Sequence, residues 1–368
     1  MYGGASPQRE QAVRRICELG SRFEEKELQL PGLTQLCNLH FVRGECREGL
    51  KLANRCLKLA EDTHDPKWLA VAHFNTAAAS MSSGNLSEAI AHFREMVSQA
   101  EQAKVKISPV GVLYETTLPL AQILQVQGRV SDALRAAELA LRHARETGHL
   151  FSLGFVLTVI EGWLRHLRRE PDAALARAEE GIALSEENGF VNWLHWGRFH
   201  RGRAFVEAGK FEQGIAEMEE ATESFRRTGG NVSLPYTQAL LAHAYARIGE
   251  FEKALSMLDE SLIRIQRTGE RRDQAEILRF KGEALLMRDT GAIAQAEKCF
   301  LQALNITREQ EAKWWELRTS VSLARVLRDT NRRHEAHVML SEIYNWFTEG
   351  FDLPDLKDAK ALLDKLSE

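Results

Sequence analysis

The sequence predicts an all-α fold: a right-handed α-solenoid of about eight helix-turn-helix repeats with a C-terminal capping helix. Three observations lead to this prediction. Short turn phrases recur about forty residues apart, and small residues stand at fixed distances on both sides of one set of these turns. The chain of 368 residues also exceeds the usual size of one compact core, which favours two domains or a repeat array.

The turns fall into two alternating sets. The first set holds the phrases TGH (147–149), NGF (188–190), TGG (228–230) and TGE (268–270). The second set lies at residues 43–50, 83–90, 127–134, 168–175, 208–215, 248–255, 290–297 and 330–337. We expect each turn of the second set to join the two helices of one repeat.

Small residues flank every turn of the second set. Five residues after the centre of the turn come Gly49, Ala89, Ala133, Ala174, Gly214, Ala254, Ala296 and Ala336. Seven residues before it, or nine in the seventh repeat, come Cys37, Ala77, Ala121, Gly162, Gly202, Ala242, Gly282 and Ala324. Glycine inside a helix costs roughly 0.5–1 kcal/mol relative to alanine. Its use there indicates that the two helices of a repeat approach closely.

This spacing resembles the tetratricopeptide repeat, which has small residues at positions 8 and 27, glycine near position 15 and alanine at position 20. Position 27 is small in five repeats, at Ala140, Gly181, Ala221, Ser261 and Ala303, but is occupied by Met96 and Ile343 in two others. The unit is longer than the usual 34 residues of that family. The resemblance therefore implies helices that are longer by about one turn.

The two ends of the chain are expected to differ from the repeats. Residues 1–29 contain one helix, over 8–28, that resembles the second half of a repeat. Residues 30–350 hold the eight repeats, and residues 351–368 form the capping helix, whose first turn suits Pro354 and Asp355. Residues 1–368 are thus predicted to form a single solenoid.

Three phrases go beyond the generic repeat: RREPDAALARAEEGIALSEENGF (168–190), WELRTSVSLARVL (315–327) and YNWFTEGFDLPDLKDAKALLDKL (344–366). They resemble the C-terminal helical region of bacterial predicted ATPases, which are often fused to class III adenylate or guanylate cyclase domains. The resemblance implies the sensor or scaffold arm of a larger signalling protein, with an ATPase or cyclase domain of the same parent protein as a partner. The chain has no GxxxxGK[ST] loop, so no catalytic residue is carried over.

Composition and charge exclude several classes of function. The formal net charge of −4 gives no electrostatic reason to expect nucleic acid as a partner. The apolar run at 150–164 is shorter than a membrane span, and the first ten residues lack the features of a signal peptide. We therefore expect a cytoplasmic protein with no membrane partner. The five cysteines form no CxxC pair and are interpreted as free apolar residues.

No catalytic, metal or cofactor site is predicted. His334 and His337 are spaced i, i+3, whereas a zinc protease needs two histidines at i, i+4 with a glutamate between them. Cys37 and His40, with Cys46 and Cys56, form a metal site only on paper, because Cys37 already fills the small position of the first repeat. An enzyme is therefore the least favoured class.

In tetratricopeptide arrays, positions 2, 5, 9 and 12 of the first helix line the concave groove. By that resemblance, the groove residues here are Trp163, His166, Trp196, Phe199, Arg203, Tyr236, His243, Arg279, Arg318, Arg325 and Arg328. The groove is predicted to be aromatic at its centre and basic toward the C-terminus. Aromatic and arginine side chains supply most binding hot spots. The alternative is that the tryptophans pack between repeats and the arginines pair with neighbouring glutamates.

These features predict a non-catalytic scaffold that binds a protein or peptide through the concave groove. Two alternatives stay open. A closed pocket around Trp163, Trp196 and Tyr236 would instead favour a sensor of small molecules. A helical-repeat RNA binder would need a basic groove along its whole length, and only the last repeats offer one.

Overall fold

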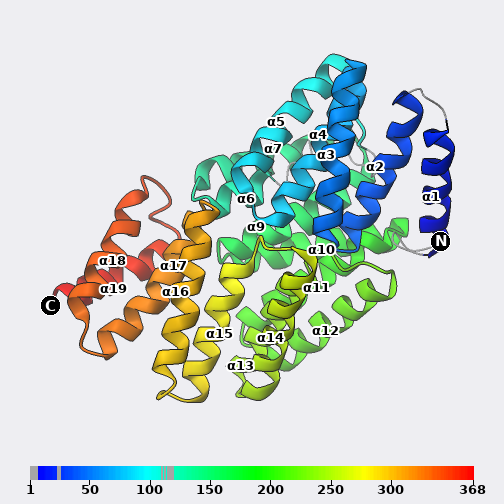
Figure 1. Cartoon of the computed structure of the whole chain (residues 1–368). Helices are drawn as coiled ribbons and strands as arrows, with labels where there is room; N and C mark the ends of the chain where they lie inside the picture. Colours follow the sequence, from blue (N-terminus) through cyan, green and yellow to red (C-terminus); the bar gives the residue numbers. More distant parts are fainter. Residues whose placement is uncertain (1–6, 23–25, 109–110, 112, 114–119) are drawn as a thin grey trace.

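The structure is a computed structural model that describes residues 7–22, 26–108, 111, 113 and 120–368. Helices follow one another along a superhelix (Figure 1). The described residues contain one isolated β-bridge, between Ile107 and Leu113, and no β-strand. The predicted all-α solenoid is confirmed.

The described helices form eight hairpins, numbered here in chain order. They are hairpin 1, α2 (Lys26–Val42) and α3 (Cys46–Thr63); hairpin 2, α4 (Pro66–Ser83) and α5 (Leu86–Ala103); hairpin 3, α6 (Leu120–Val126) and α7 (Val130–Glu146); hairpin 4, α8 (Leu150–Phe155), the π-helical η2 (Val156–Glu161) and α9 (Gly162–Leu167), then α10 (Pro171–Asn188); hairpin 5, α11 (Val191–Glu207) and α12 (Phe211–Arg227); hairpin 6, α13 (Leu234–Arg247) and α14 (Phe251–Thr268); hairpin 7, α15 (Gln274–Arg288) and α16 (Ile293–Glu309); and hairpin 8, α17 (Lys313–Asp329) and α18 (Arg333–Trp346). Each turn predicted inside a repeat joins the two helices of one hairpin.

Two further helices lie at the ends. The capping helix α19 (Pro354–Ser367) packs against α17 and α18. The helix α1 (Pro7–Ser21) packs against α2 and is shorter than predicted. The helix expected over residues 8–28 ends at Ser21, and residues 26–28 already belong to α2. At the contact between these two helices, a Cβ on Gly32 would lie 2.7 Å from Cys17 Sγ, so the glycine allows the close approach.

The small residues on both sides of each turn are buried, as their proposed role requires. A close approach of two backbones is seen in hairpin 5. A Cβ on Gly214 would lie 2.5 Å from the carbonyl oxygen of Gly202 and 2.7 Å from Val206 Cγ2. The backbones of α11 and α12 therefore touch at this point, and only glycine on both helices permits it.

The alanines of the other hairpins should tolerate enlargement poorly. Ala254 of α14 is fully buried where α14 packs against α13. We expect Ala254→Leu to lower the free energy of unfolding by about 1–3 kcal/mol, because the added atoms overpack the hairpin. The control is Ala216→Leu on the exposed face of α12. Urea unfolding that gives equal midpoints for the two variants would contradict the assigned repeat register.

The first helix of hairpin 4 is longer than the apolar run suggests. The helix is continuous over Leu150–Leu167 and is apolar and long enough to cross a membrane, unlike the shorter run at 150–164. Sixty-seven per cent of it is buried within the protein, and packing against neighbouring helices accounts for its apolar character. In its π-helical middle, the carbonyl of Val159 accepts both from the backbone N–H of Gly162 and from Gln122 Nε2, the latter at 2.8 Å.

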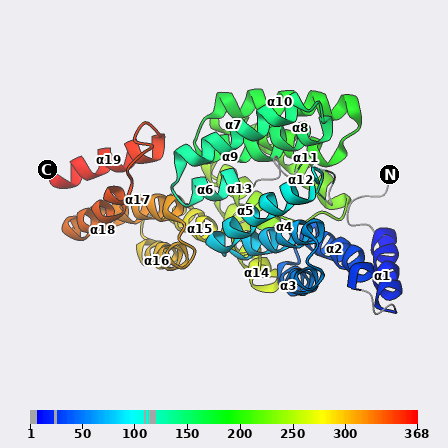
Figure 2. The ribbon, with the colours of Figure 1, turned by 90° about the horizontal axis from the view of Figure 1, so that it is seen from above.

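Successive turns of the superhelix touch one another. The carbonyl of Val42, at the end of α2, accepts hydrogen bonds from Asn231 N at 2.8 Å and Val232 N at 3.0 Å, between hairpins 5 and 6. The carbonyl of Ser82, at the end of α4, accepts from the backbone N–H groups of residues 271 and 272, between hairpins 6 and 7. Figure 2 accordingly shows α3 beside α14. Hairpins 1 and 2 thus close over the inner surface of the later hairpins.

Candidate functional site

A cavity of about 370 Å³ lies where the first helices of hairpins 1 and 2 face those of hairpins 4 and 5. We call it the central cavity. Its lining is mainly aromatic, with Phe41 and Phe74 on one side and Phe151, Phe155, Trp163, Trp193, Trp196 and Phe225 on the other. These residues come from both arms of the superhelix, so the cavity exists only because the arms close on each other.

The aromatic wall is ordered by contacts between rings. The ring centroids of Trp163 and Trp196 lie 5.9 Å apart in an edge-on arrangement, and Trp196 lies 5.3 Å from Phe225. Trp193 lies 5.2 Å from Phe155. Its indole Nε1 is buried and has no hydrogen-bond partner among the described residues. The wall is therefore a large apolar surface in which one buried indole N–H, that of Trp193, makes no hydrogen bond to the described residues.

Side-chain amides and one guanidinium supply the polar part of the lining. Asn75, Gln122, Asn192 and Arg272 all line the central cavity. Arg272 already pairs with Asp273 at 2.8 Å, which limits its free charge. An amide carries both a donor and an acceptor, and this pair of groups complements a peptide bond.

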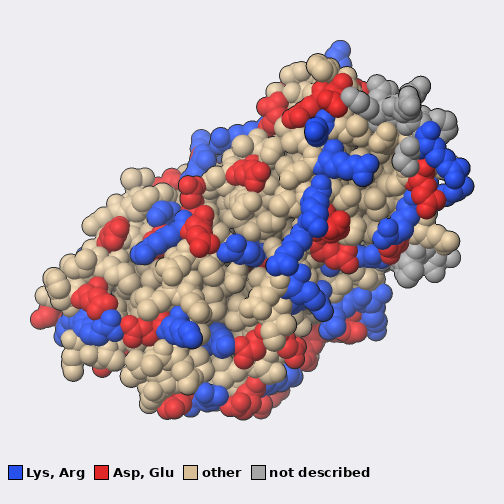
Figure 3. All heavy atoms as spheres, viewed as in Figure 1, with Lys and Arg blue, Asp and Glu red and all other residues tan. Residues whose placement is uncertain are grey.

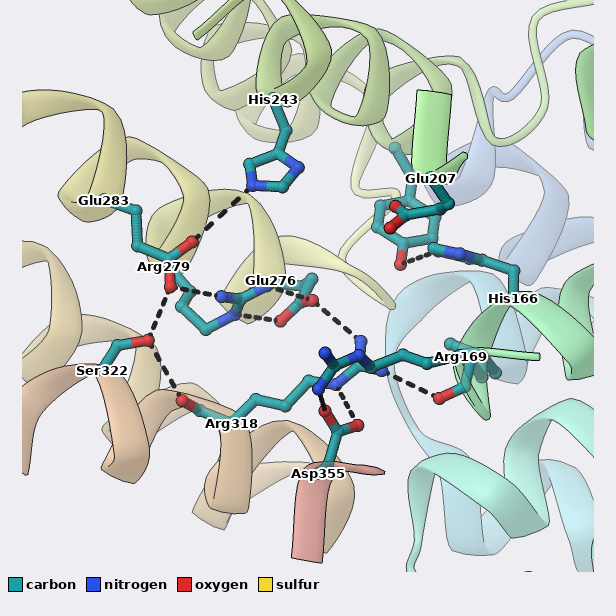
Figure 4. A network of polar contacts seen from close by, with 12 residues as sticks. His166, Arg169, Glu207, His243, Glu276, Arg279, Glu283, Arg318, Ser322 and Asp355 are labelled. Atoms are coloured by element: carbon teal, nitrogen blue, oxygen red, sulfur yellow. Dashed lines mark hydrogen bonds and ion pairs between the residues drawn. The ribbon is translucent and has the colours of Figure 1, made fainter. Parts of the chain in front are cut away.

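A buried polar network contacts Trp163 through Tyr236, and Figure 4 shows part of that network. The Trp163 ring stacks on Tyr236 at a centroid distance of 5.3 Å. Tyr236 Oη lies 3.4 Å from His166 Nε2, and Arg203 Nε donates to His166 Nδ1 at 2.8 Å. These contacts join residues of hairpins 4, 5 and 6. Trp163 therefore belongs both to the wall of the cavity and to the edge of the network.

The network continues through ion pairs to the C-terminal helix. Arg279 binds Glu276 at 2.7 Å and Glu283 at 2.6 Å. Arg318 binds Glu276 at 3.1 Å and Asp355 at 2.7 Å, and it donates to the carbonyl of Leu167 at 2.8 Å. Because Asp355 belongs to α19 and Leu167 to α9, Arg318 joins the C-terminal helix to hairpin 4 across the interior.

Arg169 strengthens the same connection. It lies in the turn of hairpin 4 and binds two carboxylates of α19, Asp355 at 3.2 Å and Asp358 at 2.6 Å. Figure 4 shows Arg169 and Arg318 reaching Asp355 from opposite sides. The C-terminal helix is therefore held to the superhelix by charge as well as by its apolar face.

The protonation states follow from burial and from these partners. Burial alone would raise the pKa of Glu276, but Arg279 and Arg318 hold it below its usual value. Burial lowers the pKa of His243 to about 4 and that of His166 well below its usual value, helped by nearby arginines. At neutral pH the network thus contains ionised carboxylates and neutral imidazoles.

The structure places the predicted groove residues in three settings. Trp163 and Trp196 line the central cavity, and Phe199 is buried beside them. The network contains His166, Arg203, Tyr236, His243, Arg279 and Arg318. Arg325 and Arg328 lie apart from both groups.

Those last two arginines do not form a basic surface with the others. Arg325 is exposed on α17, and Arg328 pairs with the adjacent Asp329 at 2.8 Å. Since Glu276, Glu283 and Asp355 compensate Arg279 and Arg318, the C-terminal part of the inner surface is not an open basic groove. Arg279 pairs with carboxylates of its own helix, whereas Arg318 pairs with carboxylates of two other helices.

Sequence reasoning missed the cavity residues of hairpins 1 and 2. The signal was present: counted from the small residue Ala77, Phe74 and Ala78 occupy positions 5 and 9 of their repeat, and counted from Cys37, Phe41 occupies position 12. The same position rule that identified Trp163 would therefore have found them. The rule does not predict, however, that these positions face hairpins 4 and 5.

The residues weighed as metal ligands form no group of three. Among the described residues, no three histidine, cysteine or acidic side chains come together in a way that could hold a metal ion. Cys37, Cys46 and Cys56 are free and buried, and burial raises the pKa of each thiol. They act as small apolar residues of hairpin 1.

Comparison with known proteins relates the chain to solenoids at the level of fold. No family model matches it, and no curated protein sequence matches it. A Rap protein complexed with Competence and Sporulation Factor aligns over 98% of this chain and 94% of its own, with TM-score 0.58 and 12% identity. NprR in complex with its cognate peptide NprX aligns over 80% and 82%, with TM-score 0.53 and 17% identity.

A third solved structure, the APC/C hetero-tetramer Cut9-Hcn1, aligns over 98% of this chain with TM-score 0.56 and 13% identity. The present chain spans 60% of the length of that protein. At these identities the likeness is one of architecture, and it identifies the fold as a tetratricopeptide-like helical solenoid.

Proposed function

We propose that the chain is a non-catalytic sensor that binds a short peptide segment, with apolar side chains of the peptide inserted in the central cavity. The observation that carries the proposal is the aromatic lining contributed by two arms of the superhelix. A cavity of about 370 Å³ lies within the size range of ligand sites, about 300–1,000 Å³. It has room for two or three apolar side chains, and the rest of the peptide would lie outside it.

The polar groups support a peptide in particular. Asn75, Gln122 and Asn192 place amides beside the aromatic wall, where they can pair with peptide N–H and C=O groups. Two of the solved structures with this architecture are complexes with a peptide or a named factor, NprR with NprX and the Rap protein with Competence and Sporulation Factor.

A variant that fills the cavity tests the proposal. Ala78 lines the cavity on α4, so Ala78→Phe places a ring in the space that a ligand would occupy. Peptides selected from a random hexapeptide library on the wild-type chain should bind Ala78→Phe at least tenfold more weakly, while the melting temperature stays the same or rises. The control is Ala216→Phe on exposed α12, which should bind as the wild type does.

Failure of this test takes two forms. If the selected peptides bind Ala78→Phe with unchanged affinity, their site lies elsewhere. If no peptide is selected but small aromatic compounds raise the melting temperature of the wild-type chain and not of Ala78→Phe, the cavity serves small molecules instead. The closure of hairpins 1 and 2 over the inner surface is the observation that favours this second candidate.

The wider context is part of the proposal. The resemblance of residues 168–190, 315–327 and 344–366 to the helical region of bacterial predicted ATPases supports a role as the sensor arm of a cytoplasmic signalling protein. In that setting an ATPase or cyclase domain would respond to the ligand. The coding sequence on either side of this chain tests this idea, since it should encode such a domain.

A further inference from the structure

A second surface, on the outside of the superhelix, has a separate chemistry. A groove of about 700 Å³ runs between α3 of hairpin 1 and α14 of hairpin 6. Its lining includes Arg43, Arg47, Lys51, Arg264 and Arg267. We call it the basic groove. It exists because the superhelix closes: Arg47 Nη2 donates to the carbonyl of Gln266 at 2.8 Å and joins the two helices.

The positive charge extends beyond the groove along α3. Arg47, Lys51, Arg55 and Lys58 are all exposed and share one face of that helix by their i, i+4 and i, i+3 spacing. Figure 3 shows Lys and Arg atoms in a stripe over the part of the surface where Figure 1 places α3. At 1.5 Å per residue the stripe is roughly 17 Å long. This concentration contrasts with the overall net charge of −4.

Three cations of the groove form no direct ion pair, although the buried Glu270 acts on Arg264 at longer range. Among the described residues, Arg47, Arg264 and Arg267 have no carboxylate within ion-pair distance, whereas Lys51 pairs with Glu48 at 3.2 Å. Arg264 is half-buried, and its Nε has no hydrogen-bond partner within the described part of the chain. An anionic ligand that bound the rest of the guanidinium would compensate its charge.

We propose that the basic groove and the stripe along α3 dock an acidic segment of a partner protein, with Asp or Glu carboxylates on Arg47, Arg264 and Arg267. The forked guanidinium matches a carboxylate with two parallel hydrogen bonds. This docking surface is distinct from the central cavity and does not depend on the function proposed for it.

The local chemistry favours an acidic protein segment over nucleic acid. Glu45 and Glu48 lie in the same groove and would repel an unbroken chain of phosphates, whereas a protein segment can place a neutral or basic residue opposite them. Among the residues that the structure describes, the lining of the groove also contains no Phe, Tyr or Trp on which bases could stack. The net negative charge of the whole chain further opposes a long polyanion.

Fluorescence anisotropy with the full chain tests the proposal. The probes are a labelled ten-residue peptide in which Asp and Glu alternate with Gly and Ser, a peptide of equal length with Lys in place of the acidic residues, and a ten-nucleotide single-stranded DNA. We expect the acidic peptide alone to bind, with an affinity that falls as salt rises. The double variant Arg264→Gln/Arg267→Gln should raise the Kd of that peptide at least tenfold, and Arg264→Lys/Arg267→Lys should restore part of the affinity.

Matched controls separate docking from folding and from the cavity. Arg142→Gln removes an exposed arginine from α7 and should leave the Kd unchanged. Ala78→Phe should also bind the acidic peptide normally, because the central cavity is a different site. The proposal is overturned if the double variant binds as the wild type does at an unchanged melting temperature. It is equally overturned if no acidic peptide binds at low salt, or if the DNA binds more tightly.

Discussion

Arg318→Ala is expected to lower the free energy of unfolding by about 3 kcal/mol and to release the C-terminal helix. Arg318 is 9% exposed, and its guanidinium meets Glu276, Asp355 and the carbonyl of Leu167. Removing one partner of a buried ion pair costs roughly 3–5 kcal/mol, since the other charge stays buried. We expect the low end of that range because Glu276 keeps Arg279 and Asp355 keeps Arg169.

Two measurements check this result. Urea unfolding gives the loss of stability, and hydrogen exchange should show early opening of residues 354–367, which lose their connection to hairpin 4. Arg325→Ala is the matched control, because it removes an exposed arginine from the same helix. If Arg318→Ala and Arg325→Ala unfold at the same urea concentration, the network contributes no net stability.

Glu270→Gln is expected to stabilise the protein at neutral and alkaline pH. Glu270 is buried beside the contact between hairpin 1 and the connection of hairpins 5 and 6, where its Oε1 accepts from Ser233 N at 2.5 Å. Burial raises its pKa to about 7, although the Ser233 N–H and Arg272 act in the opposite direction. Its Oε2 has no hydrogen-bond partner among the described residues.

The sign of the pH effect follows from the raised pKa. Between the unfolded value of 4.5 and about 7 the folded protein holds a proton that the unfolded chain has lost, so this carboxyl destabilises the fold as the pH rises. The shift corresponds to roughly 3 kcal/mol above pH 7. Glutamine carries no charge, and the variant should therefore gain on the wild type from pH 5 to pH 8.

Urea unfolding at pH 5, 6, 7 and 8 measures the difference between Glu270→Gln and the wild type. Glu260→Gln, at an exposed position of α14, is the control and should show no such trend. A difference between Glu270→Gln and the wild type that stays constant over this pH range would show that Glu270 does not titrate there. The result bears on function, because Glu270 lies where the superhelix closes over the central cavity.

Local spacing was enough to predict the hairpins. Gly202 and Gly214 stand at the two small positions of one repeat, one before the turn and one after it. The structure brings their backbones into contact, as the spacing predicts. The N-terminal helix was the exception, since its apolar residues do not reveal that α1 ends at Ser21. Short-range sequence patterns locate turns reliably when the turn recurs, and less well where it occurs once.

The candidate site was predictable only in part. The position rule found Trp163 and Trp196, which line the central cavity, but treated Arg318 as a groove residue when it is a buried link to α19. An arginine in a first helix carries no sign of which carboxylate will face it. Asp355 lies far along the chain, and only the path of the superhelix brings it to Arg318.

The sequence by itself determined the repeat, its turns and the small residues that let the helices meet, because these are contacts between residues close in the chain. The tertiary structure alone decided that the carbonyls of Val42 and Ser82 accept hydrogen bonds from connections between later hairpins, that a cavity forms between the arms, and that α3 meets α14. The physical reason is that small rotations between successive hairpins add up along a solenoid. The place where early hairpins meet later ones depends on the sum of these rotations, and no single repeat encodes that sum.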